Sequence, residues 1–542
     1  MTHVSRTPAL VCLHQLAFQF ANGKTIFNDL NLQFDHTHTA IVGRNGVGKS
    51  VLGKLIAGRL QPTAGSVTRS VPLAHVAQTF IARPGQTVAD ATGTAAALEA
   101  LQRLQRGEAA AAEDFDILDE RWDLPERLRR WLDNAGLPNI AFTDLTQPLS
   151  GGQQARLALI GAFLSPARLL VLDEPTNHLD RAGREWLMNE LERWRGGLIV
   201  VSHDRQLLER MQRIVDLTPL GVTVYGGNFS ACQQQRQIHQ AAAQATLDQS
   251  RTERRREQQR LQHEHDTIQR HAARSLRNAK TANVSGFERA GLKGAAKQIM
   301  GQVRYGHQQR KSELDAQVRD AYAKVLPDDV VLMNLPGSAV PAARKVCTLI
   351  DACVPWLPAQ GFNLALSGPV RVAVNGPNGC GKSTLLRMLA GQLHPASGEC
   401  ITHVPVAYLD QHLKLLDDRL SVIEQLLALQ SPLSESALRG HLAHLLLDAQ
   451  RVTRPSASLS GGERLKAALA VALWGKTPAQ LLLLDEPSNH LDLASVQAFE
   501  QALQTFPGAI VAVSHDTEFL QALKPTHHLD WHATEWRLQP TN

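Results

Sequence analysis

Two glycine-rich segments that both end in Gly-Lys-Ser constrain the fold of this 542-residue chain more than any other feature. They read "GRNGVGKS" at 43–50 and "GPNGCGKS" at 376–383, and each follows a short apolar run that is typical of a buried strand. In such a loop the glycines let backbone N–H groups surround phosphate oxygens, the lysine neutralises their charge and the serine hydroxyl binds Mg²⁺. The sequence therefore predicts an α/β chain with two P-loops, each placed between a strand and a helix.

Other residues repeat in the same order in both halves. The lysine of each loop lies 29 positions before a glutamine, and an aspartate lies 30 positions before a histidine. Offsets that agree between unlike residues indicate a duplicated domain rather than two chance motifs. These residues are Lys49, Gln78, Asp173 and His203 in the first half, and Lys382, Gln411, Asp485 and His515 in the second.

Each half also contains an apolar run that ends in paired carboxylates, "LLVLDEPTNHLD" at 169–180 and "LLLLDEPSNHLD" at 481–492. An aspartate at the end of such a strand can orient a Mg²⁺ ion, and the next glutamate can polarise an attacking water. The repeated offset favours a γ-phosphate contact for the histidine that follows. We therefore assign Asp173 and Asp485 to the metal, Glu174 and Glu486 to base catalysis, and His203 and His515 to the phosphate.

A serine and two glycines precede a helix-forming segment twice, in "LSGGQQARLAL" at 149–159 and "LSGGERLKAAL" at 459–469. The serine can cap the helix, but a cap does not require the glycines, which cost conformational entropy. The glycines therefore leave a bare helix N-terminus for which capping gives no reason. The candidate residues are Ser150, Gly151 and Gly152, and Ser460, Gly461 and Gly462.

The motifs divide the chain into a first domain at 1–229, a linker at 230–326 and a second domain at 327–542. The linker contains 18 Lys+Arg against 9 Asp+Glu, a net charge of about +9. Because the whole chain has a net charge of +5, the rest of the chain is near −4. This uneven distribution favours a polyanionic partner for the linker. Its polar composition predicts a solvated hairpin of two helices with a tip near 280–297, and the alternative is a disordered charged linker.

The two halves differ in one interval. It spans 72 residues from Gln78 to Ser150 but 49 from Gln411 to Ser460, so the first half has about 23 extra residues. We place them within 87–139 and predict an enlarged helical subdomain there, because the segment is polar, alanine-rich and helical in pattern.

Cysteine spacing and hydropathy argue against a zinc protein, a disulfide-bonded protein and a membrane-spanning protein. The six cysteines contain no C-x-x-C pair, which argues against a zinc site or a disulfide framework and fits a cytoplasmic location. No N-terminal signal segment is present, and no run approaches the length of a membrane span. The longest run of small apolar residues, 467–475, follows the second LSGG and predicts a buried core helix.

The order P-loop, glutamine, LSGG, DEP and SHD, found twice, resembles the ATP-binding cassette superfamily. Two such cassettes on one chain with "DEPTNHLD", "DEPSNHLD" and a basic helical linker resemble the ABC-F family over nearly the whole chain. The resemblance implies two P-loop ATP-binding cassette domains joined by a long α-helical hairpin. It also implies that the cassettes of one monomer pair head to tail, so that Ser150 acts on the nucleotide at Lys382 and Ser460 on that at Lys49.

The resemblance implies ATP and Mg²⁺ as ligands and assigns further residues to them. An aromatic ring is expected to stack on adenine, which would be Phe20 in the first cassette, while the second offers Trp356. The expected Mg²⁺ ligands are Ser50, Gln78, Asp173, Ser383, Gln411 and Asp485. The expected nucleotide-binding residues, besides Phe20, the two glutamines and the LSGG residues, are Gly43, Arg44, Asn45, Gly46, Val47, Gly48, Lys49 and Ser50, and Gly376, Pro377, Asn378, Gly379, Cys380, Gly381, Lys382, Ser383 and Thr384.

Members of the ABC-F family act on ribosomes, with the linker reaching tRNA and rRNA. The resemblance therefore implies an ATPase that binds the ribosome through the 230–326 linker and modulates translation. An alternative is the detached ATPase subunit of a membrane transporter, in which the linker only tethers the cassettes. A nucleotide-gated scaffold without turnover is disfavoured because both Glu174 and Glu486 are present.

Overall fold

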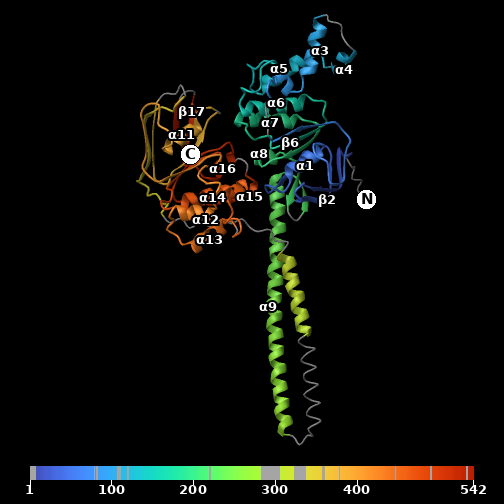
Figure 1. The fold of residues 1–542 in the computed structure, drawn as a ribbon, viewed down its shortest axis with the longest axis vertical. Helices are drawn as coiled ribbons and strands as arrows, with labels where there is room; N and C mark the ends of the chain where they lie inside the picture. The colour runs from blue at the N-terminus through green and yellow to red at the C-terminus, as the bar shows by residue number, and fades with distance from the viewer. Residues whose placement is uncertain are drawn as a thin grey trace. The chain divides into compact units, whose positions relative to one another are not determined.

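A computed structural model shows how the two halves and the linker fold. It describes residues 8–78, 80, 83–106, 112–118, 121–218, 221–281, 305–322, 337–356, 361–377, 379–445, 447, 449–488, 491–532 and 535–541. The chain forms two units of dense internal contact, Ser230–Asp328 and a larger unit made of Met1–Phe229 with Asp329–Asn542. The linker is thus one unit, and both halves with P-loops belong to the other (Figure 1).

The first half contains a six-stranded sheet in the order β5-β6-β7-β3-β8-β9. Strands β6 and β7 are apolar and buried along their whole length, as expected of parallel strands covered on both faces. Strands β8 and β9 of this sheet pair antiparallel, and a separate three-stranded antiparallel sheet has the order β2-β1-β4. The strands are β1 (Val11–Gln19), β2 (Thr25–Phe34), β3 (Thr39–Gly43), β4 (Ala64–Arg69), β5 (Leu73–Val76), β6 (Leu169–Asp173), β7 (Gly197–Val201), β8 (Arg213–Thr218) and β9 (Gly221–Gly226).

The second half repeats this topology, with sheet orders β14-β15-β16-β12-β17-β18 and β11-β10-β13. The duplicated fold predicted from the matching offsets is therefore confirmed. Its strands are β10 (Lys345–Ala352), β11 (Phe362–Ser367), β12 (Arg371–Asn375), β13 (Glu399–Thr402), β14 (Val406–Leu409), β15 (Leu481–Asp485), β16 (Ala509–Val513), β17 (His527–His532) and β18 (Glu535–Pro540).

Helices follow the strands at corresponding places in the two halves. In the first half they are α1 (Lys49–Ile56), α2 (Val88–Ala91), α3 (Ala95–Gln105), α4 (Ala112–Leu118), α5 (Leu124–Asn134), α6 (Gly151–Leu164), α7 (Arg181–Arg193) and α8 (Arg205–Glu209). In the second half they are α11 (Lys382–Leu389), α12 (Val422–Ala428), α13 (Glu435–His444), α14 (Gly461–Trp474), α15 (Leu493–Gln504) and α16 (Thr517–Ala522). The helices α2 to α5 fill the interval where the sequence predicted an enlarged helical subdomain.

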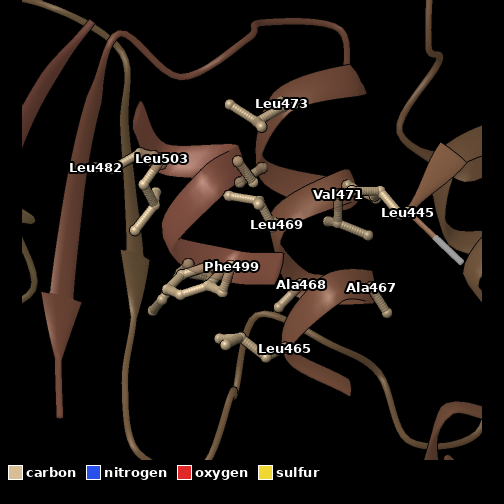
Figure 2. Packing of buried hydrophobic residues seen from close by; sticks show 14 of the residues in the cluster. Leu445, Leu465, Ala467, Ala468, Leu469, Val471, Leu473, Leu482, Phe499 and Leu503 are labelled. Atoms are coloured by element: carbon tan, nitrogen blue, oxygen red, sulfur yellow. The ribbon is translucent and has the colours of Figure 1, made fainter. Parts of the chain in front are cut away.

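Helix α14 forms the centre of the core in the second half. Its residues from Leu465 to Trp474 are all buried, which confirms the core helix predicted from the small apolar run. Figure 2 shows Leu465 and Leu469 beside Phe499 of α15, with Leu482 of β15 nearby. Small alanines between these larger side chains let the helix approach its neighbours closely. This packing fixes the position at which the LSGG serine begins the helix.

The linker forms the hairpin of two helices that the sequence predicted. Helix α9 (Phe229–Thr281) is one long helix, and a second helix at 305–322 runs back beside it (Figure 1). Arg254 and Glu264 on α9 pair with Asp315 at 3.3 Å and His307 at 3.5 Å, so the two helices are antiparallel. The predicted tip lies almost entirely outside the described residues.

Two further expectations concern cysteines and membrane spans. All six cysteines are free, as the absence of a paired spacing predicted. Among the described residues, no helix combines the length and the apolar character that crossing a membrane requires.

Candidate nucleotide sites

Each P-loop links a central strand of a six-stranded sheet to a helix that begins at the lysine of the loop. In the first half β3 leads to α1, and the residue before the helix, Gly48, has a φ of 110°. A Cβ atom there would lie 2.4 Å from Ile26 and 2.8 Å from Phe27, so only glycine fits. Gly381 has the same left-handed conformation before α11, with a φ of 88°. Both loops therefore hold the open backbone path that phosphate binding requires.

The P-loop lysines point back over their own loops. The Nζ atom of Lys49 donates to the carbonyl oxygens of Gly43 at 2.8 Å and Arg44 at 3.2 Å. Lys382 donates to Gly376 at 2.7 Å and Pro377 at 2.9 Å. Burial lowers the pKa of Lys49, although the charge of Glu174 opposes this shift. Both ammonium groups thus lie in the cradle of the loop, where phosphate oxygens can replace the carbonyls as acceptors.

The serine after each lysine contacts the aspartate at the end of a neighbouring strand. Ser50 Oγ donates to Asp173 Oδ1 at 3.1 Å, and Ser383 Oγ donates to Asp485 Oδ1 at 3.0 Å. Both aspartates are buried, and burial raises the pKa of Asp173. A hydroxyl and a carboxylate at one point form a hard oxygen donor set, which fits the Mg²⁺ ion expected there.

The glutamates that follow these aspartates have an unusual backbone and a buried carboxyl group. Glu174 has a φ of 49° and Glu486 a φ of 50°, a left-handed conformation that is costly for residues other than glycine. Burial is the main cause that raises the pKa of Glu174 to about 8 and that of Glu486 to about 7. Strain and desolvation at the same residue are typical of a functional group.

Each glutamate faces the histidine predicted for its site. His203 Nε2 lies 3.5 Å from Glu174 Oε1, and His515 Nε2 lies 3.5 Å from Glu486 Oε1. Burial lowers the pKa of His203 to about 3 and that of His515 to about 4, so both rings are neutral at pH 7. In the described part of the chain neither ring nitrogen of His203 has a hydrogen-bond partner. This neutral ring can therefore donate a hydrogen bond to a ligand.

The LSGG segments begin α6 and α14 in the same way. Ser150 Oγ accepts from the backbone N–H of Gln153 at 3.3 Å, and Ser460 Oγ accepts from Glu463 at 3.4 Å. A Cβ atom at Gly151 would have no neighbour within 4 Å, so this helix end is open. The second glycine is needed for packing, since a Cβ at Gly152 would lie 2.7 Å from the carbonyl oxygen of His178.

A cavity of about 470 Å³ lies at the first P-loop and is large enough for a nucleotide. Residues of the second half complete it, among them Ser488, Leu491 and Val496, and the backbone N–H of Asn45 donates to Asp492 at 2.8 Å. The predicted residues that line it are Phe20, Asn45, Gly46, Gly48, Lys49, Ser50, Gln78, Glu174 and His203. Part of the predicted site of the first half, including the P-loop lysine, the glutamate and the histidine, therefore lies around one cavity.

A second cavity, of about 340 Å³, lies at the other P-loop and includes Gly376, Pro377, Lys382 and His515. Asp180 and Arg181 of the first half contribute to its wall. Neither Gln411 nor Trp356 lines it, and the side chain of Trp356 is 83% exposed. Asn378 lies outside the described residues.

Several predicted residues do not line either P-loop cavity. Neither Ser150 nor Ser460 lines either of them; Gly151 instead borders a smaller cavity with Gln78 and Glu174 of its own half. Cys380 is buried behind its loop, where a Cβ on Gly376 would lie 2.6 Å from its sulfur. Cys380 thus fills space beside the phosphate loop.

One polar contact of the second site was not predicted. Tyr408 Oη donates to Asp485 Oδ2 at 2.8 Å, so this aspartate has a second hydroxyl partner. Aligning the two halves would have identified the position, since Tyr408 stands three residues before Gln411 and His75 three before Gln78. The contact itself depends on side-chain reach across the sheet, which the sequence pattern does not give.

Comparisons with known proteins agree with this geometry. The family model described as "ABC transporter" matches residues 27–177 and 359–489. The chain is 31% identical to the tylosin resistance ATP-binding protein TlrC of Streptomyces fradiae, covering 90% of this chain and 91% of that protein. It is 28% identical to ABC transporter F family member 5 of Arabidopsis thaliana, covering 92% and 72%.

A solved structure shares the fold at low sequence identity. It is the archaeal ribosome recycling factor aABCE1 in complex with the ribosomal stalk protein aP1, which matches with a TM-score of 0.57 and 18% identity over 97% of this chain and 89% of that chain. One family model that matches both halves, two P-loop sites and relatives matched over most of their length lead to one conclusion. The chain belongs to the ATP-binding cassette superfamily and, within it, to the ABC-F family of tandem-cassette proteins.

Proposed function

We propose that this protein hydrolyses ATP to ADP and phosphate at two sites, and that ATP binding closes the two cassettes into a form that binds the ribosome and modulates translation. The observation that carries the proposal is the repeated geometry of the two sites. The Ser–Asp contacts of 3.1 and 3.0 Å and the His–Glu distances of 3.5 Å agree between the halves. Duplication of both groups supports hydrolysis rather than a passive scaffold.

The residues of each site have distinct roles in this proposal. Lys49 and Lys382 neutralise phosphate charge, and Ser50 and Ser383 hold Mg²⁺ together with Asp173 and Asp485. When bound, Mg²⁺ neutralises the charge that develops on the phosphate oxygens. The glutamates Glu174 and Glu486 orient and deprotonate the attacking water, and the neutral histidines His203 and His515 donate to the γ-phosphate.

The ribosomal part of the proposal is supported by the linker and by one relative of similar fold. Arg255, Arg256, Arg270 and Arg274 are exposed on α9, in a segment with twice as many basic as acidic residues. The negatively charged phosphate backbones of rRNA and tRNA attract such a helix. The structural neighbour aABCE1 is a ribosome recycling factor, which supports a ribosomal partner for this chain.

The linker proposal predicts a strong dependence of ribosome affinity on salt. Replacing Arg274, Arg277, Lys280, Arg289, Lys293 and Lys297 by glutamine should weaken binding and flatten the plot of log affinity against log salt, because each lost phosphate contact removes about 0.7–0.9 from the slope. Filter binding of labelled ribosomes at several salt concentrations measures this slope. Steady-state phosphate release without ribosomes should stay nearly unchanged.

A matched control replaces six exposed basic residues of the cassettes: Arg193, Lys414, Arg419, Arg439, Lys476 and Arg537. This control should retain most of the slope. If the slope of log affinity against log salt is unchanged in the linker variant, the linker does not contact RNA. That result would leave the proposed hydrolysis of ATP untouched.

The raised pKa values of the two glutamates predict a pH dependence of hydrolysis at both sites. A general base acts as the carboxylate, so each site should gain rate as pH rises through the pKa of its glutamate. Burial raises the pKa of Glu174 to about 8 and that of Glu486 to about 7, so the rate at each site should rise between pH 6 and 9. Glu486→Gln leaves the first base intact and Glu174→Gln the second, so phosphate release by each variant across this range measures one site at a time. Rates that fall across this range would contradict the assignment of the bases.

A further inference from the structure

The two sites differ in what holds the metal-binding aspartate. In the second half, β14 and β15 are parallel neighbours, and Tyr408 pairs with Leu483 in the sheet register. From this position the tyrosine side chain reaches along the sheet edge to Asp485, with its Oη atom 2.8 Å from Oδ2. A residue on a different strand therefore contacts the carboxylate oxygen that the P-loop serine does not contact.

Both oxygens of Asp485 are engaged as a result. Ser383 Oγ donates to Oδ1 at 3.0 Å while Tyr408 donates to Oδ2, so the plane of the carboxylate is fixed at two points. The positive charge of Arg387, on α11, acts on the same tyrosine hydroxyl and opposes the rise of the Tyr408 pKa that burial causes. A carboxylate oxygen accepts, so the tyrosine hydroxyl donates its proton to Asp485. This bond orients the Tyr408 hydroxyl toward the aspartate.

The first site lacks this arrangement. His75 occupies the corresponding position on β5 and pairs with Val171, two residues before Asp173, as Tyr408 pairs two residues before Asp485. Its Nε2 atom is buried and has no hydrogen-bond partner among the described residues. Asp173 accepts a hydrogen bond from Ser50 at 3.1 Å. The positive charges of Lys54 and Lys49 act on the same carboxylate and oppose the rise of its pKa.

We propose that Tyr408 is a positioning residue that holds Asp485 for the metal of the second ATP site, and that the first site, with His75 in its place, binds the divalent cation more weakly. Groups that hold a metal ligand in orientation contribute about 10- to 100-fold to metal affinity or activity. A carboxylate fixed at both oxygens loses less conformational freedom when the cation binds. This inference rests on the proposed role of Asp485 as a metal ligand.

Manganese titration followed by electron paramagnetic resonance tests the inference without relying on turnover. The full chain is loaded with a non-hydrolysable ATP analogue, and Lys49→Ala or Lys382→Ala restricts tight nucleotide binding to one site. At the second site, Tyr408→Phe should weaken Mn²⁺ binding about 10-fold or more, because only the hydroxyl is removed. At the first site, His75→Phe is the matched control and should change Mn²⁺ affinity less than twofold.

A reciprocal variant makes the test independent of any loss of stability in Tyr408→Phe. His75→Tyr should tighten Mn²⁺ binding at the first site, because it supplies the missing hydroxyl. A Tyr408→Phe protein with native thermal melting and unchanged Mn²⁺ affinity would overturn the inference, and so would a folded His75→Tyr protein without tighter binding.

The Asp485→Asn variant separates failure of this inference from failure of the proposed site. If Asp485→Asn weakens Mn²⁺ binding and Tyr408→Phe does not, Asp485 remains the metal ligand and only the role of Tyr408 is lost. If Asp485→Asn has no effect, the metal placement itself is wrong, and the role of Tyr408 fails with it. Recovery of hydrolysis in Tyr408→Phe at high Mg²⁺ should accompany the weaker Mn²⁺ binding, since excess metal compensates for lost affinity.

Discussion

Hydrolysis of ATP should fall by about 10²- to 10⁴-fold when Glu174 and Glu486 are both replaced by glutamine, the contribution typical of a general base. Glutamine keeps the size of the side chain and its hydrogen bonds but removes the carboxylate that accepts the proton. ATP binding should persist, because it depends on Lys49, Lys382 and the loop backbone. Phosphate release and retention of labelled ATP on a filter measure the two effects separately.

Slow hydrolysis has a structural consequence in this variant. On the proposed mechanism, ATP that is bound but not cleaved should keep the cassettes closed, since a ligand shifts the population toward the state that binds it best. Glu192→Gln with Glu399→Gln, at two exposed positions, is the matched control and should behave like the unmodified protein. A double variant at Glu174 and Glu486 that hydrolyses ATP at the normal rate would remove both residues from catalysis.

Adding Ser150→Arg and Ser460→Arg to this variant should abolish the closed form. The open space at Gly151 shows that the start of α6 is accessible, and an arginine there would separate the helix from the opposite nucleotide. Since neither serine lines a P-loop cavity in this structure, the expected contact requires the cassettes to move together when ATP binds. Small-angle X-ray scattering with and without ATP measures the compaction.

Ser150→Ala with Ser460→Ala is the control for this experiment. It removes the side-chain cap, at a cost of about 0.5–2 kcal/mol per helix, but places no bulk at the interface. The alanine variant should still compact with ATP, and the arginine variant should not. Compaction of the arginine variant to the same extent would contradict the head-to-tail arrangement of the LSGG segments.

Local chemistry made much of the fold and of the site predictable from the sequence. The strand before Gly43 and the helix after Lys49 follow from an apolar run and from glycines that permit a left-handed turn. The buried helix after Ser460 follows from its run of small apolar residues. The repeated offsets identified the duplicated topology because they are properties of the chain itself.

Features that depend on side-chain reach between strands could not be obtained in this way. The tyrosine at 408 and the histidine at 75 are ordinary strand residues in the sequence, and their different relation to the aspartates depends on strand register and side-chain length. The direction of Lys49 toward its own loop carbonyls is likewise a result of folding. Exposure is another property that the sequence does not give: Trp356, the aromatic residue that the sequence offers for adenine in the second site, is exposed and does not line the cavity.

The most direct test of the account is co-sedimentation of the Glu174→Gln, Glu486→Gln protein with purified ribosomes and, separately, with membrane vesicles, each with and without ATP. A protein with the proposed function should be strongly enriched on ribosomes only when ATP is present, should lose that enrichment when Ser150→Arg and Ser460→Arg are added, and should not be enriched on membranes. A protein that retains ATP but stays in the supernatant with ribosomes would contradict the translational assignment, and ATP-dependent enrichment on membranes would favour the ATPase subunit of a transporter instead.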